Sequence, residues 1–475
     1  MLFTSIQYFI FLFIILFIYY TCPNSIKKTI LLFSSLFFYS YVNVSYLLLL
    51  LVLLTINYYL CIWLDTASNK FIRKRILHFS LFINIGVLVF FKYLNFLITN
   101  FFNLFHITTS FNNSFLLNIA LPLGLSYYTF QILGYLLDIY RGSQKAEKNL
   151  LDFSLFIIFF PKLLVGPIER TKHFLPQIKS PIQFNTINFV EGSKRIAWGL
   201  FKKLVVADRI SLYQTIIDTN PQQQSGITVF LASILYTFQV YADFSGYSDI
   251  AIGSARLFGY NLLENFNQPF LAKNLSEFWR RWHISLSSWV NDYIFNPTLY
   301  LHRTWGIFGV FYALFISFFI IGIWHGATWN FIIFGILQAV FLSIEALTKS
   351  IRKTISSLMP ASFYNSISVL LVFLFISFSL IIFRTPDLEK ANNIIQAILH
   401  NSGSLYYDKP STLIFILTGC IILIINDFQR EYKLFPFLML SKKKWIVASF
   451  SYVLLLIYIL IAAVFDGGQF IYFSF

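Results

Sequence analysis

The sequence predicts an all-α membrane protein whose helices cross the bilayer many times. Three observations predict this class. Hydrophobic residues make up 57% of the 475 residues and charged residues only 12%, roughly half the charged fraction of soluble domains. Apolar windows of about 18–22 residues, each sufficient for one span, recur along the chain. The basic residues behind the net charge of +15 lie in short loops between these windows, a pattern that favours anionic lipid headgroups over nucleic acid as the electrostatic partner.

We expect about eleven transmembrane helices, with further re-entrant or interfacial helices, in a single membrane domain of residues 1–475. The count is approximate because some windows are too long for one helix and others are too short. The candidate windows are residues 2–21, 29–41, 45–64, 76–104, 116–138, 150–165, 196–217, 227–258, 306–346, 366–384, 411–427 and 445–465. The first window lacks a basic leader and a small-residue cleavage site, so we expect it to remain as the first helix.

Basic clusters orient these spans. Residues 70–75 and 442–444 carry several Lys and Arg residues, which predicts that both clusters are cytoplasmic. The polar stretch 169–195 is expected to be a cytoplasmic loop. The last span then begins inside, and the aromatic tail 466–475 lies outside.

The most informative side chain is His325, which lies inside the long apolar window 306–346. An ionisable group at membrane depth costs about 2.5–3.5 kcal/mol, so it marks a functional site by default. Gly322 and Gly326 flank it at the four-residue spacing that lets a second helix approach closely, and two indoles, Trp324 and Trp329, lie on either side. The alternative is a hydrogen-bonded histidine at a helix end that does no chemistry.

Residues 274–293 predict one amphipathic helix at the membrane interface. Asn274 and Glu277 form a plausible capping pair at its start. Its apolar face consists of Leu275, Phe278, Trp279, Trp282, Leu286, Trp289, Val290 and Tyr293. Its polar face consists of Lys273, Arg280, Arg281, His283 and Asp292. The alternative to a functional His283 is therefore a solvated histidine on that polar face.

Two carboxylates, Asp243 and Asp249, lie in another apolar window. Their six-residue separation places them on different faces of a helix, which argues against a pair that shares a proton. Because an unpaired carboxylate is costly there, we favour a structural role, such as capping or an ion pair with Arg256, over catalysis.

Other chemistries find no support in the sequence. The three cysteines, Cys22, Cys61 and Cys420, are isolated, so neither a disulfide framework nor a zinc site is predicted. There is no phosphate-binding loop, no nucleophile elbow and no carboxylate cluster with metal spacing. We expect no metal and no tightly bound cofactor.

Five blocks of sequence make the chain resemble the membrane-bound O-acyltransferases, in particular the bacterial branch that O-acetylates alginate and peptidoglycan and exports D-alanine to teichoic acids. They are Phe-Pro-Lys-Leu-Leu-Val-Gly-Pro-Ile-Glu-Arg at 160–170, Gly-Leu-Phe-Lys-Lys-Leu-Val-Val-Ala-Asp-Arg at 199–209, Asp-Phe-Ser-Gly-Tyr-Ser-Asp at 243–249, Glu-Asn-Phe-Asn-Gln-Pro-Phe at 264–270 leading into residues 277–289, and Trp-His-Gly-Ala-Thr-Trp at 324–329. The blocks occur in the family's order within roughly residues 120–340.

This resemblance implies a ring of helices around a central funnel, with His325 as the family's catalytic histidine and His283 as its second histidine. We therefore assign catalysis to these two residues. Binding of the donor or substrate is assigned to Arg280, Arg281, Trp279, Trp282, Trp324, Asp243 and Asn267. The expected donor is acetyl-coenzyme A, and the expected partner is a periplasmic O-acetyltransferase of the SGNH type. The expected location is the bacterial cytoplasmic (inner) membrane.

The chain also departs from the family pattern. The family usually carries a Pro-Leu-Gly-Gly-Asn-Arg-like loop where residues 294–303 read Ile-Phe-Asn-Pro-Thr-Leu-Tyr-Leu-His-Arg, and Asn291 replaces a common arginine. These differences affect the expected donor surface. They favour peptidoglycan as the acceptor, with alginate or another exopolysaccharide as the alternative. Two alternative functions are a proton-coupled transporter, which would use His325, Asp243 and Asp249, and an inactive assembly scaffold.

Overall fold

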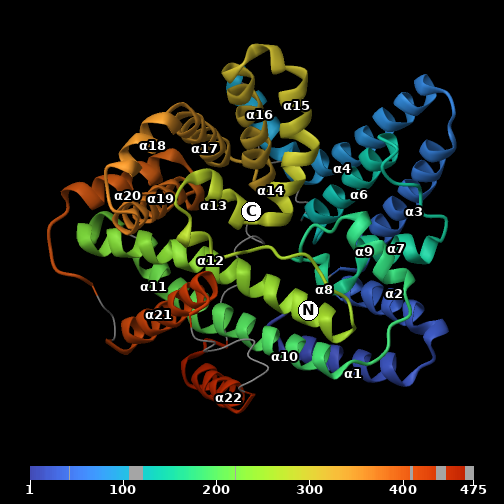
Figure 1. Ribbon diagram of the computed structural model, residues 1–475, viewed down its shortest axis with the longest axis horizontal. Coiled ribbons are helices and arrows are strands. Elements are labelled where there is room, and N and C mark those ends of the chain that lie inside the picture. The colour runs from blue at the N-terminus through green and yellow to red at the C-terminus, as the bar shows by residue number, and fades with distance from the viewer. Residues whose placement is uncertain (42, 106–120, 220, 407–409, 435–444, 466–475) are drawn as a thin grey trace. The chain divides into compact units, whose positions relative to one another are not determined.

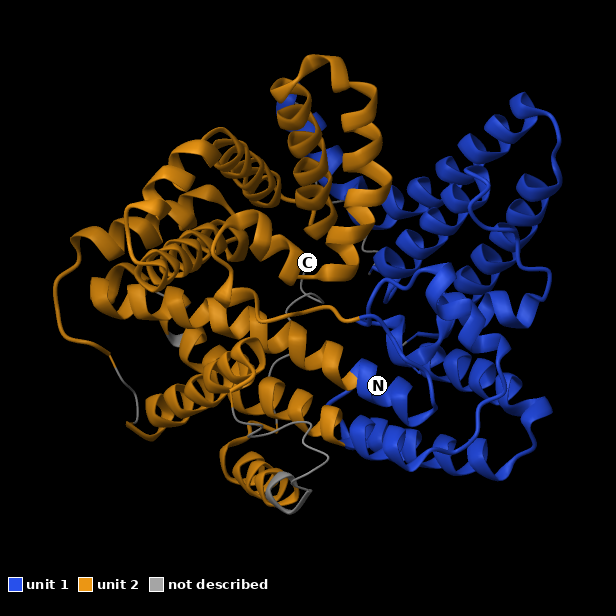
Figure 2. Cartoon of the chain, viewed as in Figure 1, with its two compact units in different colours: residues 1–193, 251–263 blue, residues 194–250, 264–475 orange. Residues whose placement is uncertain are grey.

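The computed structural model describes the chain except residues 42, 106–120, 220, 407–409, 435–444 and 466–475 (Figure 1). Every regular element in the described part is a helix, which confirms the all-α class. The chain forms two compact units (Figure 2), residues 1–193 with 251–263 and residues 194–250 with 264–475. That the whole chain is one domain around a central funnel stays a prediction, and the tail 466–475 lies outside the described residues.

The first unit contains the N-terminal helices. They are α1 (Ile6–Thr21), α2 (Asn24–Ser40), α3 (Val44–Thr66), α4 (Lys70–Leu104), α6 (Leu125–Tyr140), α7 (Leu150–Ile158), α8 (Phe160–Leu163), α9 (Thr171–Lys179) and the start of α10 (Thr186–Leu200). Side chains of Ser5, Asn43 and Asn69 cap α1, α3 and α4. Inside this unit, Asn57 and Asn84 exchange amide hydrogen bonds of 2.7 and 3.0 Å between α3 and α4, which satisfies polar groups that would be costly in an apolar layer.

The second unit contains most of the sequence blocks described above. Its helices are η1 (Phe201–Ala207), α11 (Asp208–Thr219), η2 (Pro221–Gln223), α12 (Gly226–Leu257, shared with the first unit), η3 (Pro269–Leu271), α13 (Leu275–Arg281), α14 (Ile284–Val290), η4 (Asn291–Phe295), α15 (Asn296–Leu301), η5 (Arg303–Trp305), α16 (Ile307–His325), α17 (Trp329–Leu347), α18 (Lys349–Ser357), α19 (Ala361–Arg384), α20 (Leu388–His400), α21 (Pro410–Tyr432) and α22 (Trp445–Ala462).

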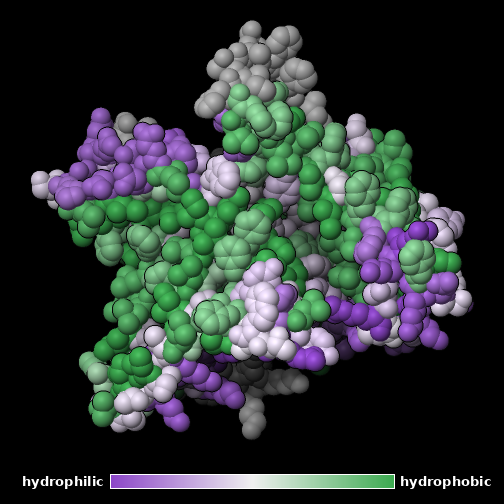
Figure 3. Space-filling model, turned by 90° about the horizontal axis from the view of Figure 1, so that it is seen from above, coloured by the Kyte–Doolittle hydropathy of each residue, from purple (hydrophilic) through white to green (hydrophobic). Residues whose placement is uncertain are grey.

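Seven of the described helices are long and apolar enough to cross a membrane: α3, α4, α12, α16, α17, α19 and α21. They establish a polytopic membrane protein but do not confirm the expected count of about eleven. Hydrophobic residues cover most of the face drawn in Figure 3, with hydrophilic residues gathered in separate patches. Large apolar side chains such as Phe82 and Leu371 are exposed on these helices, as expected for surfaces that face lipid.

Helices α16 and α17 form a tight hairpin from the long apolar window. A methyl group added at Gly322 would lie 2.5 Å from the carbonyl oxygen of Phe331, and one added at Gly335 would lie 2.3 Å from that of Phe318. Glycine at both positions therefore lets the two backbones touch. This confirms the close approach predicted beside His325.

Basic residues orient the second unit in the membrane. Lys349, Arg352 and Lys353 lie on α18, between the end of α17 and the start of α19, and such clusters mark the cytoplasmic side. With α18 on the cytoplasmic side, as this cluster predicts, α19 is expected to end, at Arg384, on the outer side and α21 to run back towards the cytoplasm. Arg281 of α13 pairs with Glu431 at the C-terminal end of α21, which ties α13 to that cytoplasmic end.

A buried ion network joins η1 to α12. Lys203 lies 2.8 Å from Asp243 and 2.6 Å from Asp208, and Asp249 pairs with Lys202 and Arg195. Close approach of α10 and η1 to α12 is possible because Gly199 of α10 and Gly246 of α12 each lie against the other's carbonyl oxygen. The ion-pair role expected for the two aspartates is thus borne out, but the expected partner, Arg256, is wrong.

We predict that Asp243→Asn destabilises the protein, because it leaves the buried ammonium of Lys203 without one of its two carboxylates. Breaking a buried ion pair typically costs about 3–5 kcal/mol, so the variant should show a clearly lower unfolding temperature in detergent. Glu389→Gln, at an exposed position on α20, is the control and should leave it unchanged. A variant at Asp243 as stable as the wild type would contradict the proposed structural role.

Candidate functional site

His325 is the last residue of α16 and is enclosed by aromatic side chains. Its side chain is buried, with the residue 5% exposed. Its ring centroid lies 4.9 Å from that of Phe383 on α19, and 6.3 and 6.2 Å from those of Phe331 and Phe334 on α17. Three helices thus place an ionisable ring in a setting from which bulk water is largely excluded.

His283 lies at a break between two short helices. Its backbone has a φ of 43°, in the left-handed region that non-glycine residues rarely adopt. The residue is 1% exposed, its ring packs edge-on against Phe244 of α12 at 4.7 Å, and in the described part of the chain neither ring nitrogen has a hydrogen-bond partner. The single amphipathic helix expected over residues 274–293 is therefore wrong, as is a solvated His283, because the break turns this side chain inward.

Asn265 holds this break in place. Its backbone carbonyl accepts a 2.9 Å hydrogen bond from the Ile284 amide, and its side-chain oxygen accepts a 2.6 Å bond from the Ser285 hydroxyl. Before the break, the side chain of Asn274 caps α13 by accepting from the Glu277 amide at 2.8 Å, which confirms the predicted capping pair. Asn265 itself is buried beside the first residues of α14. The sequence interpretation missed this residue.

Burial controls the charge of His283. Removal from water lowers its pKa from the ordinary value of 6.5 to about 3, since an apolar environment penalises the charged form. The ring is therefore neutral at physiological pH. A neutral imidazole has one nitrogen that donates a hydrogen bond and one that accepts it, so His283 can orient a polar group brought into contact with it.

Trp324 links the two histidines. The centroid of its indole lies 5.7 Å from that of the His283 ring and 5.0 Å from that of the adjacent His325 ring. The structure therefore brings together both residues to which we assigned catalysis, although they come from separate sequence blocks. Because its indole contacts both rings, Trp324 belongs to the same site.

Trp279 and Trp282, the other two tryptophans assigned to binding, pack in and beside α13. The Nε1 group of Trp279 donates a 3.3 Å hydrogen bond to the side-chain oxygen of Gln338 on α17. Trp282 is buried and stacks on Phe278 at 5.5 Å. Both side chains have a structural explanation, and their part in substrate binding stays a prediction.

The adjacent arginines differ in their surroundings. Arg281 makes two hydrogen bonds with the carboxylate of Glu431, of 2.6 and 2.8 Å, and also pairs with Glu277. Arg280 is exposed and reaches the edge of a cavity. The backbone amide of Asn267 donates a 2.9 Å bond to the carbonyl of Arg281, so Asn267 belongs to the loop that supports α13.

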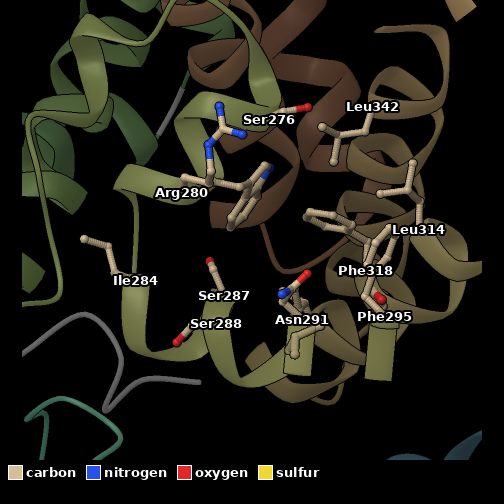
Figure 4. Close-up of a pocket in the computed structure, with 14 residues that line it drawn as sticks. Ser276, Arg280, Ile284, Ser287, Ser288, Asn291, Phe295, Leu314, Phe318 and Leu342 are labelled. Atoms are coloured by element: carbon tan, nitrogen blue, oxygen red, sulfur yellow. The ribbon is translucent and has the colours of Figure 1, made fainter. Parts of the chain in front are cut away.

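A cavity of about 370 Å³ lies between the segment from α13 to η4 and helices α16 and α17. Figure 4 shows Leu314, Phe318 and Leu342 on one side of it, with Arg280, Ser287 and Ser288 on the other. Asn291 also lines it. The cavity combines apolar walls with hydroxyl groups and one cation at its edge.

Asp243 does not belong to the aromatic group around His325. It lies in the ion network of η1, while its neighbour Phe244 contacts His283.

Besides Asn265, the sequence interpretation missed Lys203 and Phe383. Two consecutive lysines inside an apolar window were a legible signal for the ion network, whereas nothing in the sequence distinguishes Phe383 from the other phenylalanines.

We predict that His283 makes the protein acid-sensitive. Because the folded pKa is lowered, the unfolded chain binds the proton more readily, so the contribution of His283 to stability is complete above pH 6.5 and is lost as pH falls towards about 3. Between pH 7 and pH 5 the wild type should lose about 2 kcal/mol more stability than His283→Gln. Thermal unfolding at both pH values measures this, and equal losses in the two proteins would contradict it.

Comparisons with known proteins identify the family of the chain. Residues 36–383 match the model of the MBOAT, membrane-bound O-acyltransferase family. The chain is 34% identical over 446 residues to the probable alginate O-acetylase AlgI of Pseudomonas putida, covering 91% of this chain and 89% of that protein. It is 33% identical over 405 residues to the peptidoglycan O-acetyltransferase of Helicobacter pylori, with coverages of 79% and 74%.

A third relative is more distant and covers less of both chains. The teichoic acid D-alanyltransferase of Streptococcus thermophilus is 32% identical over 247 residues, which are 49% of this chain and 59% of that protein. The family match and the similarities to the alginate and peptidoglycan relatives show that the chain is an O-acyltransferase and belongs to the membrane-bound O-acyltransferase family.

Proposed function

We propose that this enzyme takes an acetyl group from a cytoplasmic donor and passes it across the membrane for O-acetylation of a cell-envelope polysaccharide. The observation that carries the proposal is the placement of His283 and His325 against one indole inside the second unit. The relatives that bear the names alginate O-acetylase and peptidoglycan O-acetyltransferase support acetyl transfer to a polymer.

In this proposal His325 is the general base. A base within about 2.6–3.2 Å of a hydroxyl oxygen removes its proton as the oxygen attacks the acetyl carbonyl. The bond between the carbonyl carbon and the sulfur of the thioester then breaks, and the leaving thiolate takes the proton from the imidazolium. The aromatic enclosure of His325 limits competing hydrolysis by water, while His283 orients the donor through its neutral ring.

The proposed donor is acetyl-coenzyme A, in preference to a carrier-protein thioester. The cavity of Figure 4 supports it, because apolar walls suit an extended thioester arm and the hydroxyls of Ser287 and Ser288 suit its amides. Arg280, exposed at the edge, is the arginine suited to the phosphates, because Arg281 is engaged by Glu431.

The proposed acceptor pathway is peptidoglycan O-acetylation in the bacterial inner membrane, with alginate or another exopolysaccharide as the second candidate. A periplasmic SGNH-type transferase is the proposed partner that completes delivery to the polymer. If the purified membrane protein alone acetylated polysaccharide at the full cellular rate, the partner would be unnecessary.

The ion pairs of the second unit bear on the transporter alternative. In a proton path, Asp243 and Asp249 would exchange protons, yet each carboxylate is paired with a buried lysine. Such pairing stabilises the charged carboxylate. Family membership and this pairing both favour acyl transfer over proton-coupled transport.

We predict that His325→Ala abolishes polymer acetylation. Loss of a general base typically lowers the rate by about 10²- to 10⁴-fold, which mass spectrometry of cell-wall glycan would register as loss of O-acetyl groups at normal protein levels. His302→Ala is the matched control, because His302 also packs on aromatic rings, Trp305 and Tyr312, but lies outside the site. Acetylation at the wild-type level in the His325 variant would refute the assignment.

A further inference from the structure

Glu345, near the end of α17, has both carboxylate oxygens engaged by the start of α13. Its Oε2 atom accepts a 2.6 Å hydrogen bond from the backbone amide of Leu275. Its Oε1 atom accepts a 2.6 Å bond from the Ser276 hydroxyl and a 3.3 Å bond from the Ser276 amide. A side chain from a separate helix therefore binds the first two amides of α13, and the mechanism proposed above does not use Glu345.

Helix α13 depends on such external contacts for its position. It has only seven residues, and a helix this short is marginal by itself, because its first amides have no partner inside the helix. The side chain of Asn274 accepts a 2.8 Å bond from the amide of Glu277, whereas the two preceding amides rely on Glu345. The carboxylate is also favoured there because the N-terminal end of a helix carries a partial positive charge.

A second contact holds α13 to the same face of α17. Gln338 lies about two turns before Glu345 and accepts the 3.3 Å hydrogen bond from the Trp279 indole. Leu342 lies between these two residues and lines the cavity of Figure 4. Helix α17 therefore fixes α13 over the cavity at two points, the first turn through Glu345 and the middle through Gln338.

The part of α13 that Glu345 holds is the part that faces the cavity. Ser276 and Arg280 lie one turn apart on one face of α13, and Figure 4 shows both beside the cavity. The oxygens of Glu345 are occupied by the N–H and O–H donors of Leu275 and Ser276, and a carboxylate repels phosphate. Glu345 is therefore suited to act on a bound donor through the position of α13, not by direct contact.

We propose that Glu345 is a positioning residue for the thioester donor. By holding the first turn of α13 against α17, it keeps Arg280 at the cavity edge, where the proposed donor carries its phosphates. Glu345 thereby sets the preference for acetyl-coenzyme A over acetyl-pantetheine, which has the same thioester arm but no phosphate. The inference rests on the function proposed above and adds a residue that determines donor specificity.

The test is binding of acetyl-coenzyme A and of acetyl-pantetheine to the purified protein in detergent, measured by calorimetry. We expect the wild type to bind acetyl-coenzyme A at least about tenfold more tightly than acetyl-pantetheine, as charge-assisted hydrogen bonds to phosphate imply.

Glu345→Gln replaces one carboxylate oxygen with an amide group, which leaves one N–H of α13 facing another donor. The variant should bind acetyl-coenzyme A about five- to tenfold more weakly, as expected for loss of a helix cap. Its affinity for acetyl-pantetheine should change less than about twofold, because Arg280 makes no phosphate contact with that ligand. Glu389→Gln, the same substitution at an exposed position in the first turn of α20, should change neither affinity.

A double variant separates positioning from a merely structural role. Arg280→Ala should also remove most of the preference for acetyl-coenzyme A. If Glu345 acts through Arg280, adding Glu345→Gln to that variant should weaken binding further by less than about twofold, because the two losses are not additive. Monodispersity and unfolding temperature are measured first. If Glu345→Gln does not fold, Glu345→Asp, which keeps the charge on a shorter side chain, should lower the preference in the same direction.

Three results would overturn the inference: equal weakening of both ligands by Glu345→Gln, unchanged binding of both ligands, or losses that add in the double variant. Acetylation that still depends on His325 would then leave the proposed function standing. No binding of acetyl-coenzyme A to the wild type would instead overturn the proposed donor, and the inference with it.

Discussion

The left-handed backbone at His283 is the constraint on which the site depends. A continuous helix through residues 274–293 would present this side chain on its polar face. The break at φ 43° instead directs the ring into an apolar space between Phe244 and Trp324. Such a conformation persists only when its surroundings enforce it, and Asn265 does so by binding both Ile284 and Ser285.

The cavity of Figure 4 lies beside this site, against α13. Arg281 and Glu431 tie that helix to the cytoplasmic end of α21. On the other side, Phe383 contacts the His325 ring one residue before the C-terminal end of α19. A histidine at the end of α16, between these regions, is suited to receive a thioester from one side and a hydroxyl from the other.

Local sequence signals predicted much of this arrangement. An ionisable residue in an apolar window identified His325, and the glycines beside it predicted the close hairpin of α16 and α17.

The break at His283 was not predictable, because apolar residues continue at helical spacing through the break. The residue that enforces the break, Asn265, lies outside that pattern. The partners of Asp243 and Asp249 were missed for a similar reason. They depend on the close approach of η1 to α12, which periodicity within one segment does not encode.

The most direct test places donor and acceptor on opposite sides of a membrane. The protein is reconstituted in sealed vesicles, with acetyl-coenzyme A added only on the side of α18 and a hydroxyl-bearing acceptor, together with any required partner, enclosed on the other side. Mass spectrometry then measures acetyl ester on the enclosed acceptor. The account predicts that ester accumulates there with the wild type and not with His325→Ala. If ester formed only when the acceptor was instead placed on the donor's side, the result would contradict a site open to both faces.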